Sequence, residues 1–178
     1  LLDPTIRPLM PALQSNWLLF HVATTLLAYA ALGMATLSSV IFLIRYRSAH
    51  FPPQNSPLSK PRGATFKGGT TGPPFSQDLA GIDAFTFRAM TLGFILLTIG
   101  VILGAVWANE AWGTYWSWDP KETWSLITWF VYAIAVHLRR LHKWQGKRFA
   151  WLAVAGFACV LFTYFGVNYL LSGLHSYA

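Results

Sequence analysis

Four long apolar segments alternate with polar connections along the chain. They cover residues 17–44, 89–107, 120–138 and 149–171. Each is close to or above the roughly 20 residues that an α-helix needs to cross about 30 Å of hydrocarbon at 1.5 Å per residue. The pattern predicts an all-α integral membrane protein, one membrane domain with four transmembrane helices.

The composition agrees with this prediction. Of the 178 residues, 54% are hydrophobic and only 11% are charged, and the mean hydropathy is +0.44, outside the usual range for a soluble domain. The net charge of +7 does not indicate nucleic-acid binding, because the basic residues lie between apolar segments. The single cysteine, Cys159, excludes a disulfide, a zinc cluster or a CxxC pair within the chain.

The basic residues also predict the orientation of the spans. Every Lys and Arg except Arg7 and Lys121 lies in the connections 45–88 and 139–148. The positive-inside rule places these connections in the cytoplasm or stroma. Both chain ends and the segment 108–124 are then external, on the periplasmic or lumenal face. The stretch from Ser48 to Gln77 is rich in Pro, Gly and Ser and is predicted to be a flexible loop.

The external segment gathers tryptophans and rare charges in the stretch AWGTYWSWDPKETW, residues 111–124. Part of it reads as a helix start, with Asp119 as N-cap, Pro120 at the first helical position and Glu122 completing a capping box. Tryptophans also favour the bilayer interface for purely structural reasons. A cluster this dense nevertheless predicts an exposed aromatic shelf, and exposed apolar patches commonly mark binding sites. The residues of interest are Trp112, Trp116, Trp118, Asp119 and Trp124.

Three histidines are candidate iron ligands. His21 lies near the outer end of the first span and His175 follows the fourth, so both are predicted on the face that carries the tryptophans. Two imidazoles from different helices can ligate a haem iron; the alternative is that each is an interfacial residue with ordinary polar partners. His137 lies about 25 Å along the third span. It is either an intramembrane ligand or an interfacial residue beside the basic pair Arg139 and Arg140.

Three segments together carry a family resemblance: PALQSNWLLFHV at 11–22, GAVWANEAWGTYWSWDPKETWSLITW at 104–129 and YFGVNYLLSGLHSYA at 164–178. The middle segment is similar to the WWD motif of haem-handling membrane proteins. In this order the three segments resemble the CcsA (ResC) family of system II cytochrome c biogenesis proteins. The likeness covers the chain except the predicted loop from Ser48 to Gln77.

The resemblance implies a specific assignment of these residues. An external haem b is held by His21 and His175 and cradled by the WWD segment. A second haem lies lower in the membrane, with His137 as one ligand and the other ligand in a CcsB (ResB) partner. The complex moves haem outward and attaches it to the CxxCH motif of an apocytochrome c, so this protein is a component of a haem lyase that forms thioether bonds.

The resemblance also implies a location and a longer protein. The membrane is a thylakoid or a bacterial plasma membrane. Members of the resembled family usually carry further spans before the segment that begins at Leu1, and this chain lacks them; it also lacks an initiating Met and a signal-peptide pattern, so one part of a longer protein is expected. Lys121 or Arg7 can pair with haem propionates, or Lys121 can neutralise its acidic neighbours. No residue is assigned to the bond-forming step.

Three alternative functions stay open. They are a CcmC-like protein that delivers haem without ligation, a bis-His cytochrome that transfers electrons, and a structural subunit.

Overall fold

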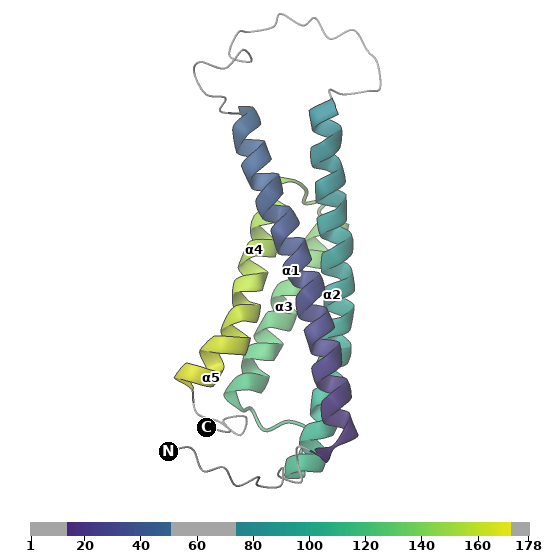
Figure 1. The fold of residues 1–178 in the computed structure, drawn as a ribbon, viewed down its shortest axis with the longest axis vertical. Helices are drawn as coiled ribbons and strands as arrows, with labels where there is room; N and C mark the ends of the chain where they lie inside the picture. The colour runs from purple at the N-terminus through teal and green to yellow at the C-terminus, as the bar shows by residue number, and fades with distance from the viewer. Residues whose placement is uncertain (1–13, 51–73, 172–178) are drawn as a thin grey trace, which may run out of the picture.

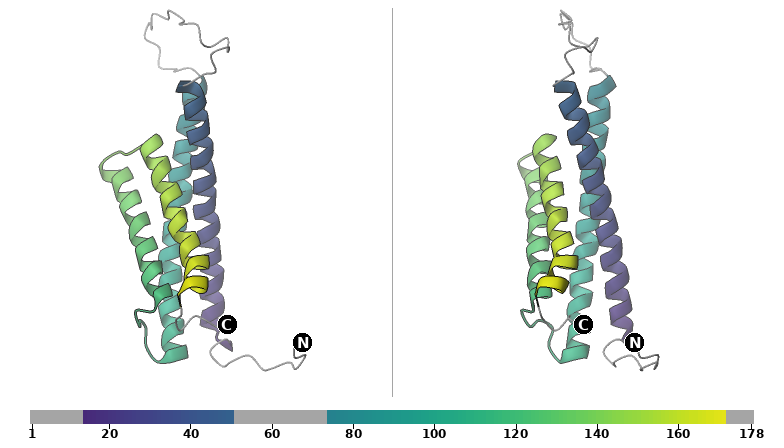
Figure 2. Two further views of the ribbon diagram at one scale, coloured as in Figure 1. Left: turned by 90° about the vertical axis from the view of Figure 1, so that its left-hand side faces the viewer. Right: turned by 60° about the vertical axis from the view of Figure 1, so that its left-hand side comes forward.

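The computed structural model describes residues 14–50 and 74–171, which contain helices and no strand. The elements are α1 (Asn16–His50), α2 (Pro74–Trp112), α3 (Pro120–Leu141), α4 (Lys147–Leu161), the π-helix η3 (Phe162–Gly166) and α5 (Val167–Leu170). Figure 1 shows α1 and α2 as two long helices, with the shorter pair α3 and α4 beside them. Successive long helices run in opposite directions (Figure 2).

Within the described residues, three helices are long and apolar enough to cross a membrane: Asn16–Ser48, Gln77–Trp112 and Lys147–Leu170. The protein is therefore an integral membrane protein. Helix α3 has 22 residues but carries Lys121 and Glu122 at its start and Arg139 and Arg140 in its last turn, which lowers its apolar character. The crossing of the membrane by α3 stays a prediction.

The helices extend beyond the predicted spans. The predicted loop from Ser48 to Gln77 is too long at both ends. Helix α1 continues to His50, and α2 already begins at Pro74. Residues 74–88 are thus helical, although the sequence places them in a connection. Proline suits the first turn of a helix, and the polar side chains of this extension are used in packing, as Thr86 is buried and donates to the Ile82 carbonyl over 2.9 Å.

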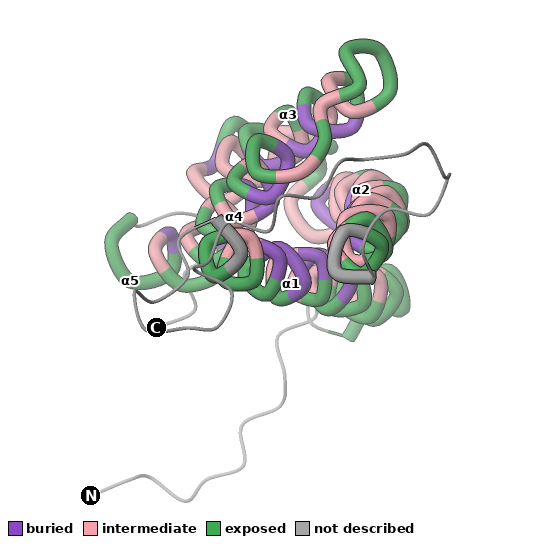
Figure 3. The backbone as a smooth tube through the Cα atoms, turned by 90° about the horizontal axis from the view of Figure 1, so that it is seen from above, coloured by how far each residue is buried: buried purple, intermediate pink, exposed green. Residues whose placement is uncertain are grey.

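Close approach of the helices depends on small residues. A Cβ at Gly93 of α2 would lie 2.6 Å from the Leu32 side chain of α1, and one at Gly156 of α4 would lie 2.9 Å from the Tyr132 ring of α3. Leu32 and Tyr132 are fully buried. Figure 3 shows the buried positions on the helix faces that meet each other, and the outward faces exposed. This is the pattern of helices that pack by shape within a bilayer.

An ion pair fixes the α3–α4 connection onto the extended part of α2. Arg139 Nη2 lies 2.5 Å from Asp83 Oδ2, and both side chains are nearly buried. Asp83 Oδ1 also accepts from the Gly146 backbone N–H over 2.9 Å, while Arg139 Nη1 donates to the Trp144 carbonyl over 3.0 Å. The guanidinium also lies over the Phe149 ring. Asp83 therefore holds both the end of α3 and the start of α4.

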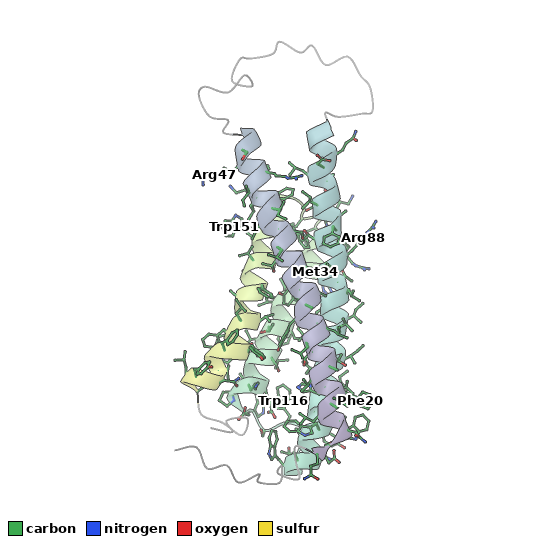
Figure 4. The ribbon with its side chains drawn as sticks, viewed as in Figure 1. Phe20, Met34, Arg47, Arg88, Trp116 and Trp151 are labelled. Carbon is green, nitrogen blue, oxygen red and sulfur yellow. The ribbon has the colours of Figure 1, made fainter. Side chains whose placement is uncertain are left out.

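The two ends of the bundle differ in chemistry. In Figure 4, Arg47 and Arg88 lie toward the upper end, where α1 ends and α2 begins, and Phe20 and Trp116 lie toward the lower end. The start of α1, the end of α2, the start of α3 and α5 all lie at this lower end (Figure 1). The tryptophan segment and His21 are therefore at one end of the molecule, which we call the tryptophan end.

Candidate functional site

A cavity of about 410 Å³ lies inside the bundle at the tryptophan end. Residues 18 to 29 of α1 and 97 to 108 of α2 form its long walls, a depth of about 16 Å at 1.5 Å per residue. The start of α3 and the η3–α5 turn complete it. Most of the exposed surface of the lining is apolar, although twelve of the lining residues carry a polar group: His21, Thr25, Tyr29, Trp107, Tyr115, Trp116, Lys121, Glu122, Ser125, Thr163, Tyr164 and Asn168.

His21 is the predicted ligand that the structure places in the cavity wall. Its Nδ1 lies 2.8 Å from the Gly100 carbonyl oxygen of α2. A Cβ at Gly104 would lie 2.8 Å from both Cε1 and Nδ1 of the imidazole, so only glycine leaves room for the ring. When Nδ1–H donates to a carbonyl, the lone pair is on Nε2, which is the usual arrangement of a metal-ligating histidine.

Thr25 follows His21 one turn along α1 and lines the cavity farther from the tryptophan end. Its hydroxyl donates to the His21 carbonyl over 2.8 Å. A Cβ at Gly100 would lie 2.6 Å from the Thr25 Cγ2. The pair Gly100 and Gly104, one turn apart on α2, therefore receives two consecutive turns of α1. The sequence analysis missed this pair, although two glycines four residues apart in an apolar span are a recognisable signal of close helix packing.

The four predicted tryptophans do not form one flat surface. Trp116 lines the cavity, and its ring meets the Trp118 ring edge-on at 6.0 Å. Trp118 is 69% exposed. Trp112 packs edge-on against Trp107 at 4.8 Å, and Trp124 lies 4.3 Å from the Phe162 ring of η3. The structure thus brings Trp116 to the cavity and gives Trp112 and Trp124 packing contacts with other aromatic rings.

The capping interpretation of the DPKE stretch is confirmed. The Asp119 side chain accepts from the Lys121 N–H over 3.0 Å, and the Glu122 side chain accepts from the Asp119 N–H over 3.2 Å. Glu122 Oε2 also accepts from the backbone N–H and the hydroxyl of Ser117, at 2.8 and 3.1 Å. Glu122 therefore caps the N-terminus of α3. Its bonds to Ser117 also hold the preceding tryptophan segment beside the cavity. Its second oxygen, Oε1, is buried and has no hydrogen-bond partner among the described residues.

His137 does not line the cavity. His137 is exposed on α3, and its Nδ1 lies 2.9 Å from the Ala133 carbonyl oxygen. It lies in the half of α3 away from the tryptophan segment. His175 lies outside the described residues. Within residues 14–50 and 74–171, no group of three or more His, Cys, Asp or Glu side chains could hold a metal ion.

These observations define the class of the protein. It is a helical integral membrane protein with a mostly apolar cavity at one end of the bundle. A histidine with a fixed ring orientation, two tryptophans and a lysine line this cavity.

The chain belongs to the family described as Cytochrome C assembly protein, whose model matches residues 2–175. It is 45% identical to the cytochrome c biogenesis protein CcsA of Chlamydomonas reinhardtii over 96% of this chain and 43% of the relative. It is 44% identical to the CcsA of Gloeobacter violaceus, over 99% and 63%, and 46% identical to that of Microcystis aeruginosa, over 97% and 62%. The chain thus spans 43% to 63% of the length of these relatives.

Proposed function

We propose that this chain is the haem-presenting part of a CcsA-type cytochrome c biogenesis protein. It binds haem b in the cavity at the tryptophan end, on the external face of the membrane. Together with a CcsB partner it presents the haem to an apocytochrome c. The observation that carries the proposal is His21, held by the Gly100 carbonyl in the wall of a mostly apolar cavity beside Trp116.

The residues of the cavity fit a haem. The long walls of α1 and α2 offer apolar side chains to a flat apolar ring, and His21 offers an imidazole nitrogen to the iron. Trp116 and Tyr115 provide aromatic surface, and Lys121 provides a positive charge. His175 is the proposed second axial ligand. His137 is the proposed ligand of an inner haem, with its exposed position on α3 open to a partner subunit.

The position of the cavity suits a haem that must be handed over. It lies at the end of the bundle and is bordered by the connecting segment 113–119, so a peptide can approach the ring edge from outside. In the reaction, the S–H bond of each substrate cysteine adds across one vinyl C=C bond. A C–S bond and a C–H bond form, and no net oxidation takes place. The role of this chain is to hold and orient the haem through ligands that the histidine of the substrate can replace.

The proposal is tested by purifying the native protein with its CcsB partner and a CxxCH substrate. We expect a haem spectrum in the complex and haem on the substrate that survives denaturation. A substrate with both cysteines changed to serine is the control and is expected to carry none. Haem that is bound but never transferred would instead favour a delivery protein or an electron-transfer cytochrome. A complex without haem would leave a structural subunit.

A further inference from the structure

Lys121 lies where the helix dipole disfavours a cation, and among the described residues only the nearby Asp119 carboxylate offsets this locally. Lys121 is the second residue of α3, where the helix dipole carries partial positive charge and a cation is unfavourable. The acidic neighbours Asp119 and Glu122 already accept backbone N–H groups in the capping box. Among the described residues that line the cavity, Lys121 is the only one with a fixed positive charge.

The Lys121 side chain points across the cavity rim to α5. Its Nζ donates to Asn168 Oδ1 over 3.0 Å, and the Asn168 amide is oriented by its own bond from Nδ2 to the Tyr164 carbonyl, at 2.8 Å. The hydrogen-bond partner of the ammonium group is a neutral amide, and the Asp119 carboxylate attracts the group electrostatically. An ammonium group has three N–H donors, so the group can bind an anion while it keeps Asn168.

We propose that Lys121, positioned by Asn168, anchors a carboxylate of the ligand at the cavity rim. This inference rests on the proposed function, in which the ligand is haem b and the carboxylate is a propionate. Charge-assisted hydrogen bonds to a carboxylate are stronger than neutral ones, and the apolar surroundings screen the charge less than water does. Because the propionates and the vinyl groups occupy opposite halves of the porphyrin, an anchor at the α3–α5 rim turns the vinyl edge away from that rim.

The anchor is tested by comparing haem with its dimethyl ester, in which the propionates carry no charge. Both ligands are titrated into the full-length protein, as wild type and as the variants Lys121→Met, Lys121→Gln, Lys121→Arg and Asn168→Ala. Lys143→Met, an exposed lysine beyond the far end of α3, is the matched control. We expect wild-type protein to prefer haem over the ester by about tenfold, in keeping with a charge-assisted bond.

Lys121→Met and Lys121→Gln are expected to lose this preference, through weaker binding of haem and unchanged binding of the ester. Lys121→Arg and Lys143→Met are expected to retain it, because each keeps a positive charge at position 121. Asn168→Ala is expected to reduce the preference in part, because the charge stays but loses the amide that positions it. If Lys121→Met weakens the binding of haem and of the ester equally, Lys121 only links α3 to α5 through its bond to Asn168, and the inference is wrong. Unchanged haem binding in Lys121→Met also overturns it while leaving the proposed function intact. Wild-type protein that binds neither ligand overturns both.

Discussion

Alanine at position 104 is expected to weaken binding of the external haem by about tenfold or more, as expected when an outer contact of a metal ligand is lost. A Cβ there would lie 2.8 Å from the His21 imidazole, so the ring must rotate. Rotation breaks the 2.8 Å contact between Nδ1 and the Gly100 carbonyl. The same substitution raises the intrinsic helix propensity by about 1 kcal/mol, so the loss of haem is expected in a protein that still folds.

The measurement is a haem titration of Gly104→Ala, together with the absorption spectrum of the bound haem. We expect a change from a six-coordinate to a weaker, lower-coordinate species. Gly81→Ala on the same helix is the control, because a Cβ at Gly81 would meet nothing within 4 Å. A Gly104→Ala protein with the affinity and the spectrum of wild type would show that the fixed His21 ring has no part in haem binding.

Removal of the Glu122 carboxylate is expected to release the tryptophan segment. Glu122→Ala deletes the acceptor of the Ser117 and Asp119 N–H groups. The N–H of the buried Asp119 left without a partner costs about 1–3 kcal/mol, and the lost cap costs about 1 kcal/mol. The remaining contacts of this short connecting segment are too few to offset these costs. Residues 113–119 are therefore expected to detach from the start of α3, and Trp116 is expected to leave the cavity.

Hydrogen exchange measures this opening directly. The amides of Ser117 and Asp119 are expected to exchange faster by about tenfold or more in Glu122→Ala, which corresponds to about 1.4 kcal/mol at the lower limit. Glu122→Gln keeps an acceptor oxygen and is expected to lie between Glu122→Ala and wild type. The amides of α4 serve as the internal reference. Equal exchange of the segment in all three proteins would contradict the role assigned to Glu122.

The helices and the capping box could be predicted from local sequence. Apolar segments of the length of a membrane span, and the spacing of Asp119, Pro120 and Glu122, depend on residues a few positions apart. The helical residues 74–88 were missed because the signal is tertiary. Their polar side chains are stabilised by residues distant in the sequence, as Asp83 is by Arg139. The π-helix at Phe162–Gly166 likewise has no local signal that we recognised.

The site was predicted only in part, for the same reason. The identity of His21 as a candidate follows from its place near a span end, whereas its orientation depends on Gly100, 79 residues away. The tryptophans were expected to form one shelf because their spacing was the only information available. Their actual directions depend on backbone conformation, with positive φ angles of 76° at Gly113 and 59° at Trp118, which turn successive rings to different partners.

The most direct measurement of the central claim is the spectrum of the external haem in native protein and in His21→Ala. His142→Ala, an exposed histidine at the other end of α3, is the control. The account predicts a low-spin, six-coordinate haem in wild type and in His142→Ala, and loss of that signal in His21→Ala with at least about a tenfold fall in haem transferred to the CxxCH substrate. An unchanged spectrum and unchanged transfer in His21→Ala would contradict it.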